Sequence, residues 1–195
     1  VADHLKDRFA VVQRPIDPTD IAEVKAGHLA ITELVTVTPA GEGGRAKLLH
    51  LQHNHESETG WKAVEVDLPT KRLGDGAPLH GSIEQISAFY QNGHIHALIH
   101  YPQGESGRRT VLPMQYLPNE MRWRAWDLRD TVDDDGYDIM CGDLRNALYS
   151  TRQTDVYRTP KGNHVFYGVS TAQDDDKFFI VFETENGFWE AASEH

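Results

Sequence analysis

Three histidines lie at even positions of one short segment, NGHIHALIHYP (residues 92–102). On a β-strand, His94, His96 and His100 would point to the same face, because successive side chains alternate between the two faces. Several imidazoles on one strand face can supply ligands to zinc or iron. The pattern is compatible with a metal site, with a sugar site or with a purely structural strand.

A second histidine pair would make a metal site easier to build. His53 and His55, in the segment HNHESE, have the same two-residue spacing, and Glu56 and Glu58 stand beside them. If this segment met residues 94–100 in the fold, five histidines would gather in one place. His94, His96 and His100 lack the Asp-His continuation of metallo-hydrolases and the spaced glutamate of a cupin. We expect no cofactor, with a metal ion held by these histidines as the alternative.

The same histidines could act on a sugar. Imidazole donates and accepts hydrogen bonds, and its pKa near neutrality suits general acid/base catalysis. If the protein is an enzyme, the expected catalytic residues are His96, His100 and Tyr101, although Tyr101 falls on the opposite strand face. In the structural interpretation, the apolar residues between the histidines face the core. The histidines then line a solvated surface or a surface between repeated units.

Tryptophans offer a second kind of sugar site. The segment RWRAWDLR (122–129) combines two tryptophans with arginines and Asp127. An aromatic ring can cover the apolar side of a pyranose, while arginine and acidic groups bind its hydroxyls. Trp123 and Trp126 have odd spacing, so one of them would face the core and the other solvent. The residues expected to bind a ligand are Trp61, Trp126, Trp189, Arg124, His94 and His96.

Two acidic segments are expected to be solvated loops. DDDGYD (133–138) matches a calcium-binding loop only in part, because Thr131 would occupy a ligand position and no glutamate closes the loop. QDDDK (173–177) is typical of a hairpin turn. The chain has no glycine-rich phosphate loop and no nucleophile elbow, which argues against nucleotide-dependent chemistry.

Composition limits the classes of partner. The 195-residue chain carries a net charge of −11, so neither a nucleic-acid backbone nor an anionic membrane surface is an expected partner. No apolar run approaches the roughly 18 residues that cross a bilayer, so no membrane insertion is expected. The single Cys141 excludes an internal disulfide. The chain begins at Val1 without a visible signal peptide, which fits a mature secreted or cell-surface protein or a piece of a longer chain.

Helix signals occur only near the N-terminus. Asp17 as N-cap, Pro18 at the first helical position and Gly27 as the stop predict a short helix, and residues 2–12 are a weaker candidate. Eleven short strands should follow. They are expected at residues 28–39, 46–54, 61–69, 82–91, 94–102, 110–118, 122–128, 146–157, 164–171, 177–185 and 188–193. Without helical crossovers the sheets must be antiparallel, so the predicted fold class is all-β.

The strands form a weak internal repeat. Trp61, Trp126 and Trp189 lie in three similar segments and are spaced by 65 and 63 residues. An apolar strand that contains histidine lies upstream of each tryptophan strand. Self-similarity of this kind is typical of a β-propeller or another array of repeated units.

In these segments the chain resembles the blades of sialidase-like β-propellers. The similarity rests on NGHIHALIHYP, LPMQYLP and RWRAWDL in the middle of the chain, and on residues 161–192. Each stretch has a glycine turn, a histidine strand, a strand ending in an aromatic residue and a tryptophan strand. The resemblance implies three blades over residues 28–195. The Ser-x-Asp-x-Gly-x-Thr-Trp box of true sialidases is absent, so sialidase chemistry is not implied.

The expected organisation is an N-terminal segment with a short helix (1–27) and a propeller-like domain (28–195). A closed propeller usually has about four to eight blades, and three would leave open sheet edges. A degenerate fourth blade near the N-terminus, a longer chain or assembly into a homo-oligomer would each resolve this. A β-sandwich or a barrel of about eight to ten strands is the alternative fold.

We therefore expect a non-catalytic recognition module that binds a carbohydrate, as lectins do, or a protein. A polysaccharide lyase or hydrolase on the same scaffold is the first alternative, because some propeller-fold polysaccharide lyases use His and Tyr as acid and base. A structural or assembly domain whose open edge pairs with a neighbour is the second. The fold supports all three, because function resides in the sites that a fold carries.

Overall fold

The computed structural model is built almost entirely of β-strands. It describes residues 8–16, 19, 24–25, 27, 30–38, 45–54, 57–72, 76–79, 83–103, 108–125, 148, 151–170, 177–183 and 189–194. The elements are β1 (Phe9–Pro15), β2 (Ala30–Thr38), β3 (Lys47–His53), β4 (Trp61–Asp67), β5 (Gln85–Gln91), β6 (His94–Gln103), β7 (Arg108–Leu117), the 3-10 helix η2 (Pro118–Glu120), β8 (Arg122–Ala125), β9 (Thr151–Arg158), β10 (His164–Ser170), β11 (Lys177–Glu183) and β12 (Trp189–Glu194). Within these residues, no helix has the length and apolar character that crossing a bilayer requires.

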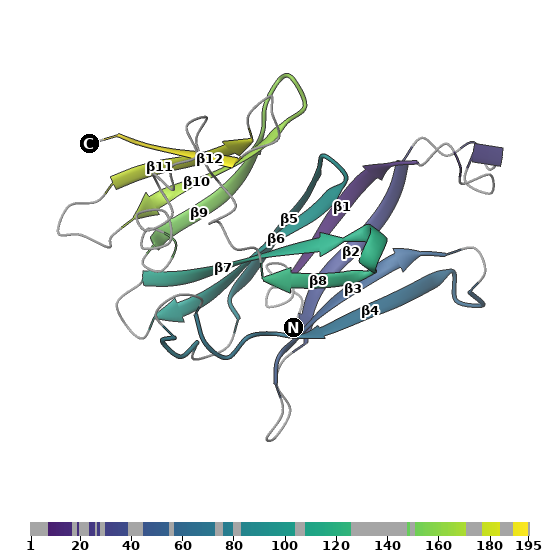
Figure 1. Ribbon diagram of the computed structural model, residues 1–195, viewed down its shortest axis with the longest axis horizontal. Helices are drawn as coiled ribbons and strands as arrows, with labels where there is room; N and C mark the ends of the chain where they lie inside the picture. The colour runs from purple at the N-terminus through teal and green to yellow at the C-terminus, as the bar shows by residue number, and fades with distance from the viewer. Residues whose placement is uncertain are drawn as a thin grey trace.

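The strands are arranged as three consecutive antiparallel meanders (Figure 1). Strands β1–β4 form meander 1, β5–β8 form meander 2 and β9–β12 form meander 3, and within each meander every strand pairs with the next one in the chain. Among the described residues, one backbone pair, Arg109 with Thr151, joins β7 to β9. This contact links meanders 2 and 3 into one eight-stranded sheet.

The first strands of the meanders lie close together. Strand β1 runs beside β5, and β5 contacts β9. Consecutive four-stranded antiparallel meanders whose first strands lie close together are propeller-like blades. The all-β, antiparallel, propeller-like fold class is therefore confirmed. Each of the eleven expected strands has a counterpart among β2–β12, and the described strands do not close into a barrel.

The N-terminal region differs from the expectation. The weaker of the two expected helices is wrong, because residues 9–15 form β1 and pair along their whole length with β2. Val12 is buried while its neighbours Val11 and Gln13 are exposed, which is the two-residue period of a strand. Strand β1 completes a four-stranded meander 1, so the sheet includes residues that the sequence assigned to the N-terminal segment.

The stronger helix candidate is described only near its end. Val24 and Lys25 are helical, and the N–H of Gly27 donates to the carbonyl of Val24 at 3.1 Å. Gly27 has a φ of 72°, the left-handed conformation that glycine adopts readily after a helix. Asp17 and Pro18 lie outside the described residues.

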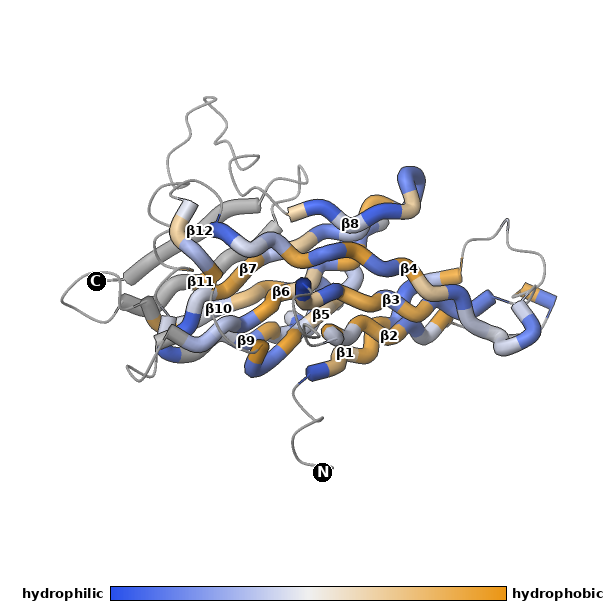
Figure 2. The backbone as a smooth tube through the Cα atoms, turned by 90° about the horizontal axis from the view of Figure 1, so that it is seen from below, coloured by the Kyte–Doolittle hydropathy of each residue, from blue (hydrophilic) through white to orange (hydrophobic). Residues whose placement is uncertain are grey.

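The main core lies between meander 1 and meander 2. Buried apolar side chains from both meanders meet there, and Figure 2 shows hydrophobic segments in orange along β1, β2, β3 and β7. Val35 and Leu48 of meander 1 and Ala97 and Ile99 of meander 2 are fully buried. This packing holds the side chains of the first three strands against those of β5, β6 and β7.

A two-residue turn sets the register of β5 and β6. Asn92 and Gly93 both have positive φ, 47° and 84°, as a type I′ turn requires. We expect Gly93→Ala to lower the free energy of unfolding by about 1 kcal/mol, because a Cβ disfavours this backbone even though the space around it is open. Chemical denaturation measures the change. Asn92→Gly is the control and should stay within about 0.5 kcal/mol of the wild type. An unchanged Gly93→Ala protein would contradict this account of the turn.

Candidate functional site

Two of the three histidines on β6 are buried between meanders. His96 is 2% exposed and His100 is 0% exposed, so they do not line a solvated surface. The ring of His96 stacks on Phe89 of β5 with centroids 5.1 Å apart, and Phe89 also stacks on His164 of β10 at 5.2 Å. For His96, the surface between repeated units is therefore the structural alternative that is observed.

This environment keeps the two histidines neutral at neutral pH. Burial, followed by the charges of His94 and His164, lowers the pKa of His96 to about 3. Burial, followed by the charge of Arg109, lowers the pKa of His100 to about 4. Neither imidazole would exchange protons with a substrate near pH 7.

The structure does not assemble the expected catalytic group. Tyr101 is buried on the face of β6 opposite to His96 and His100, and burial raises its pKa to about 12. A substrate would have to reach both sides of a covered strand at once. The set His96, His100 and Tyr101 therefore forms no common site.

The expected metal ligands are also kept apart. Nδ1 of His94 lies 3.0 Å from the carbonyl oxygen of Asn92, and the His94 ring centroid is 6.3 Å from that of His96. The ring of His53 packs edge-on against Trp61 in meander 1. The described residues contain no group of three or more His, Cys, Asp or Glu side chains that could hold a metal ion. His55 lies outside the described residues.

The aromatic ligand candidates have separate locations. Trp123 is buried in the core and packs against Tyr116, with ring centroids 5.5 Å apart. Trp61 is 37% exposed on β4. Trp126 and the side chain of Trp189 lie outside the described residues, as does the segment 133–138. Arg124 donates two hydrogen bonds to the Gln115 Oε1, at 3.1 and 2.9 Å.

A buried ionic network in meander 1 was not anticipated from the sequence. Glu33 of β2 and His50 of β3 are both fully buried. Nε of Arg14 on β1 donates to Oε1 of Glu33 at 2.5 Å, and Nε2 of His50 lies 2.6 Å from Oε2. Three adjacent strands thus contribute one residue each to the same face.

The network keeps Glu33 ionised. Burial alone would raise its pKa, but the hydrogen bonds and charges of His50 and Arg14 outweigh burial and lower it. Nε2 of His50 therefore donates to the carboxylate. Nδ1 of His50 has no hydrogen-bond partner among the described residues, and the ring meets Tyr116 and Trp123 edge-on. His50 is closed off from any substrate and positions Glu33.

The network forms one wall of a cavity between meanders 1 and 2. The cavity has a volume of about 580 Å³, and we call it the Tyr90–Tyr116 cavity. Arg14, Glu33 and Gln52 line it from meander 1, and the two tyrosines line it from meander 2. Nε2 of Gln52 donates to the Tyr116 hydroxyl at 2.9 Å. Burial, partly offset by this bond, raises the pKa of Tyr116, so its phenol stays protonated.

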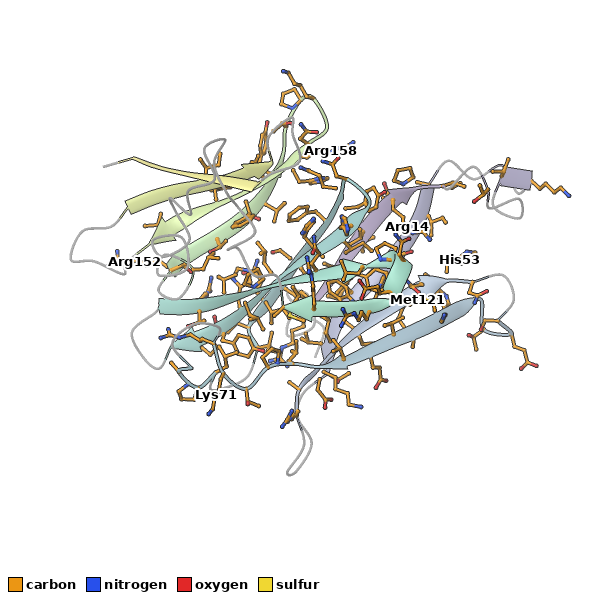
Figure 3. All side chains as sticks on the ribbon, viewed as in Figure 1. Arg14, His53, Lys71, Met121, Arg152 and Arg158 are labelled. Carbon is orange, nitrogen blue, oxygen red and sulfur yellow. The ribbon has the colours of Figure 1, made fainter. Side chains whose placement is uncertain are left out.

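The rim of the cavity is exposed to solvent. Met121 follows η2 and is 60% exposed, and it lines the cavity together with Pro118. Figure 3 shows Met121 and Arg14 in the region where η2 and the end of β1 approach each other. Met121 has a left-handed φ of 49°, which closes the turn between β7 and β8. The site therefore has a polar, aromatic interior and an open entrance.

Sequence signals for this site exist in retrospect. Residues Ile31, Glu33, Val35 and Val37 alternate on one face of β2, so Glu33 interrupts an otherwise apolar face. A buried carboxylate needs partners with charge or hydrogen bonds. A charged residue in the apolar register of a strand is thus the feature that marks the network.

Comparisons with known proteins assign no family to the chain. No family model and no curated protein matches it. An exo-1,5-α-L-arabinanase from a bovine ruminal metagenomic library is similar over 85% of this chain and 70% of its own, with 14% identity and a TM-score of 0.38. A trans-AT PKS dehydratase domain from Brevibacillus brevis is similar over 96% and 73%, with 12% identity and a TM-score of 0.17. Both TM-scores are below 0.5, so neither structure supports the assignment of a fold or a ligand to this chain. The comparisons also show no sialidase-like family.

Chemically, the cavity is suited to binding a small polar molecule. A fixed guanidinium, an amide and a phenol can bond to hydroxyl groups, and the tyrosine rings offer flat apolar surface. Pockets of roughly 300–1,000 Å³ with a few placed polar groups are typical of small-molecule sites. This combination of hydrogen-bonding groups and flat apolar surface is better suited to a sugar ring than to a purely apolar ligand.

Proposed function

We propose that the protein is a non-catalytic recognition module that binds a carbohydrate in the Tyr90–Tyr116 cavity. The observation that carries this proposal is the convergence of Arg14, Gln52 and two tyrosines on one open cavity. Of the residues expected to bind a ligand, His96 is covered. The lining of this cavity does not include Trp61, Arg124 or His94, so the proposed site is a different one.

The polar groups are held ready for a ligand. Glu33 fixes Arg14 through Nε, and the terminal nitrogens of Arg14 have no hydrogen-bond partner among the described residues. Gln52 is fixed by its bond to Tyr116, which leaves its amide oxygen as an acceptor. A ligand that meets groups already in place costs less conformational entropy on binding.

An enzyme at the same cavity would need a second acid. Retaining and inverting glycosidases place two carboxyl groups roughly 5–10 Å apart. Glu33 is the one acidic residue among the described residues that line this cavity, and both of its oxygens are engaged. Binding without cleavage is therefore the better supported function. Release of reducing ends from a glycan that the protein binds would overturn the non-catalytic assignment.

A glycan array followed by calorimetry tests the proposal. We expect a coherent set of sugars to bind, and Tyr90→Ala and Gln52→Ala each to weaken binding about tenfold through loss of a ring contact or a hydrogen bond. Tyr157→Ala is the matched control, because Tyr157 is exposed on meander 3 and does not line the cavity. Thermal unfolding confirms that each variant is folded. Binding that depends on Trp61 but not on Tyr90 would overturn the proposed location.

A further inference from the structure

A second cavity lies where the first strands of the three meanders come together. It has a volume of about 670 Å³ and is bounded by β1, β5 and the β9–β10 hairpin. We call it the Arg158 cavity. It shares Arg14, Pro15 and Tyr90 with the Tyr90–Tyr116 cavity, so the two cavities adjoin. A ligand longer than one sugar unit could occupy both.

The charge of the Arg158 cavity is opposite to that of the whole protein. Arg14 and Arg158 line it, and its described lining residues include no aspartate or glutamate. The chain as a whole carries a net charge of −11. Arg14 is already paired with Glu33, so Arg158 is the guanidinium of this cavity that offers a local site for negative charge in so acidic a protein.

Arg158 is positioned by backbone rather than by a carboxylate. Its Nε lies 3.5 Å from the carbonyl oxygen of Gly162, and none of the ion pairs among the described residues involves it. The turn after it is closed by bonds from the N–H of Thr159 to the Asn163 carbonyl and from the N–H of Gly162 to the Thr159 carbonyl, at 2.7 and 2.9 Å. The Arg158 guanidinium is therefore positioned by a backbone carbonyl, and no carboxylate among the described residues forms an ion pair with it.

The wall next to Arg158 is uncharged, and it includes His164, the cross-strand partner of Arg158. The ring of His164 stacks on Phe89 and is hydrogen-bonded to the backbone of Tyr90. Burial, followed by the charge of Arg158, lowers the pKa of His164, so the ring is neutral at neutral pH. The side chain of Gln91 accepts a hydrogen bond from the backbone N–H of His164 at 2.5 Å, which ties β10 to β5.

We infer that the Arg158 cavity binds the anionic group, a carboxylate or a sulfate, of an acidic sugar. Guanidinium groups match such oxyanions with paired, charge-assisted hydrogen bonds. This inference rests on the proposed function and names its ligand class: an acidic glycan whose sugar ring occupies the Tyr90–Tyr116 cavity and whose anionic group meets Arg158. Arg14 stands between the two parts of the site.

Nuclear magnetic resonance of the arginine Nε–Hε groups tests the inference in the intact chain. Glucuronate, glucose 6-sulfate, methyl glucoside and acetate would be titrated separately. We expect the Arg158 signal to shift with the two acidic sugars and to shift at least tenfold less at the same concentration with methyl glucoside. Arg158→Gln should weaken acidic-sugar binding at least tenfold and leave methyl glucoside binding unchanged.

Arg152→Gln is the matched control. Arg152 lies on the same strand as Arg158 but near its other end, outside the cavity (Figure 3), so this variant should bind acidic sugars as the wild type does. Equal binding of glucuronate and methyl glucoside, unaffected by Arg158→Gln, would overturn the inference and leave the proposed function intact. Acetate binding as strong as glucuronate binding would support an anion site and overturn sugar recognition. If no anion shifts the Arg158 signal, the inference is overturned. The glycan array tests the proposed function separately.

Discussion

Glu33→Gln should lower the free energy of unfolding by about 3 kcal/mol at pH 7, measured by urea denaturation. The variant keeps the size of the side chain but removes the charge that holds Arg14 and His50. Removing one partner of a buried ion pair typically costs about 3–5 kcal/mol, because the remaining polar groups stay buried without compensation. The lower end of that range applies here, because the Arg14 side chain is 29% exposed and can regain water.

The sign of the pH dependence gives this prediction a second check. The pKa of Glu33 is lowered in the folded protein, so its contribution to stability is present above its ordinary value of 4.5 and is lost as the pH falls through the lowered folded pKa. The difference between Glu33→Gln and the wild type should therefore narrow in acid. Denaturation at pH 7 and at pH 3 measures both values.

The control for Glu33 is a carboxylate of the same kind on the surface. Glu65 pairs with Lys47 at 3.0 Å, and both side chains are exposed. Glu65→Gln should have little effect, because water and salt screen an exposed pair. If Glu33→Gln were as stable as the wild type at both pH values, the Glu33 carboxylate would not stabilise the fold. That result would contradict the role of the ionic network in this cavity wall.

Acid should also destabilise the protein through the two buried histidines of β6. Lowering the pH from 6.5 to 5 is expected to remove about 1–2 kcal/mol for each of His96 and His100, or about 3 kcal/mol together. Their folded pKa values, about 3 and about 4, lie below the ordinary 6.5. The unfolded chain therefore takes up protons in this window and the folded chain does not. The stabilisation is complete above pH 6.5 and is lost as the pH falls towards the folded values.

His100→Leu isolates half of this effect. His100 is fully buried and neither ring nitrogen has a hydrogen-bond partner among the described residues, so an apolar side chain forfeits no bond. The variant should be about 2 kcal/mol more stable than the wild type at pH 5, with a smaller gain at pH 7. Leu98→Met, at a buried position on the same strand face, should keep the wild-type slope between pH 6.5 and 5. An unchanged slope in His100→Leu would show that His100 is protonated in the folded protein.

The sequence predicted the strands well because their signals are local. Alternating apolar residues and glycine turns such as Asn92–Gly93 mark β2–β12 without any knowledge of packing. Strand β1 was missed because its apolar residues, Phe9 to Val12, are consecutive rather than alternating, and helix signals lie on both sides of it. Its strand character depends on pairing with β2, which is a long-range contact.

The site was harder to predict because it depends on how meanders pack. The alternation of β6 separates the histidine face from the apolar face, but it does not say that both faces are covered. The burial of His96 follows from meander 3, whose His164 stacks on the other side of Phe89. The same limit hid the Tyr90–Tyr116 cavity, which joins residues from six different strands and the turn that follows η2.

The pairing of each strand with its neighbour in the chain also bears on how the protein is made. Closing the short loops between neighbouring strands costs little chain entropy, and proteins dominated by contacts between residues close in sequence fold quickly. Meander 1 can therefore form on the ribosome while later residues are still being synthesised. Meander 3 joins meander 2 through one described backbone pair and through side chains, so its docking is expected to be the last step. The Arg158 cavity, which needs residues from all three meanders, comes into existence only at that step.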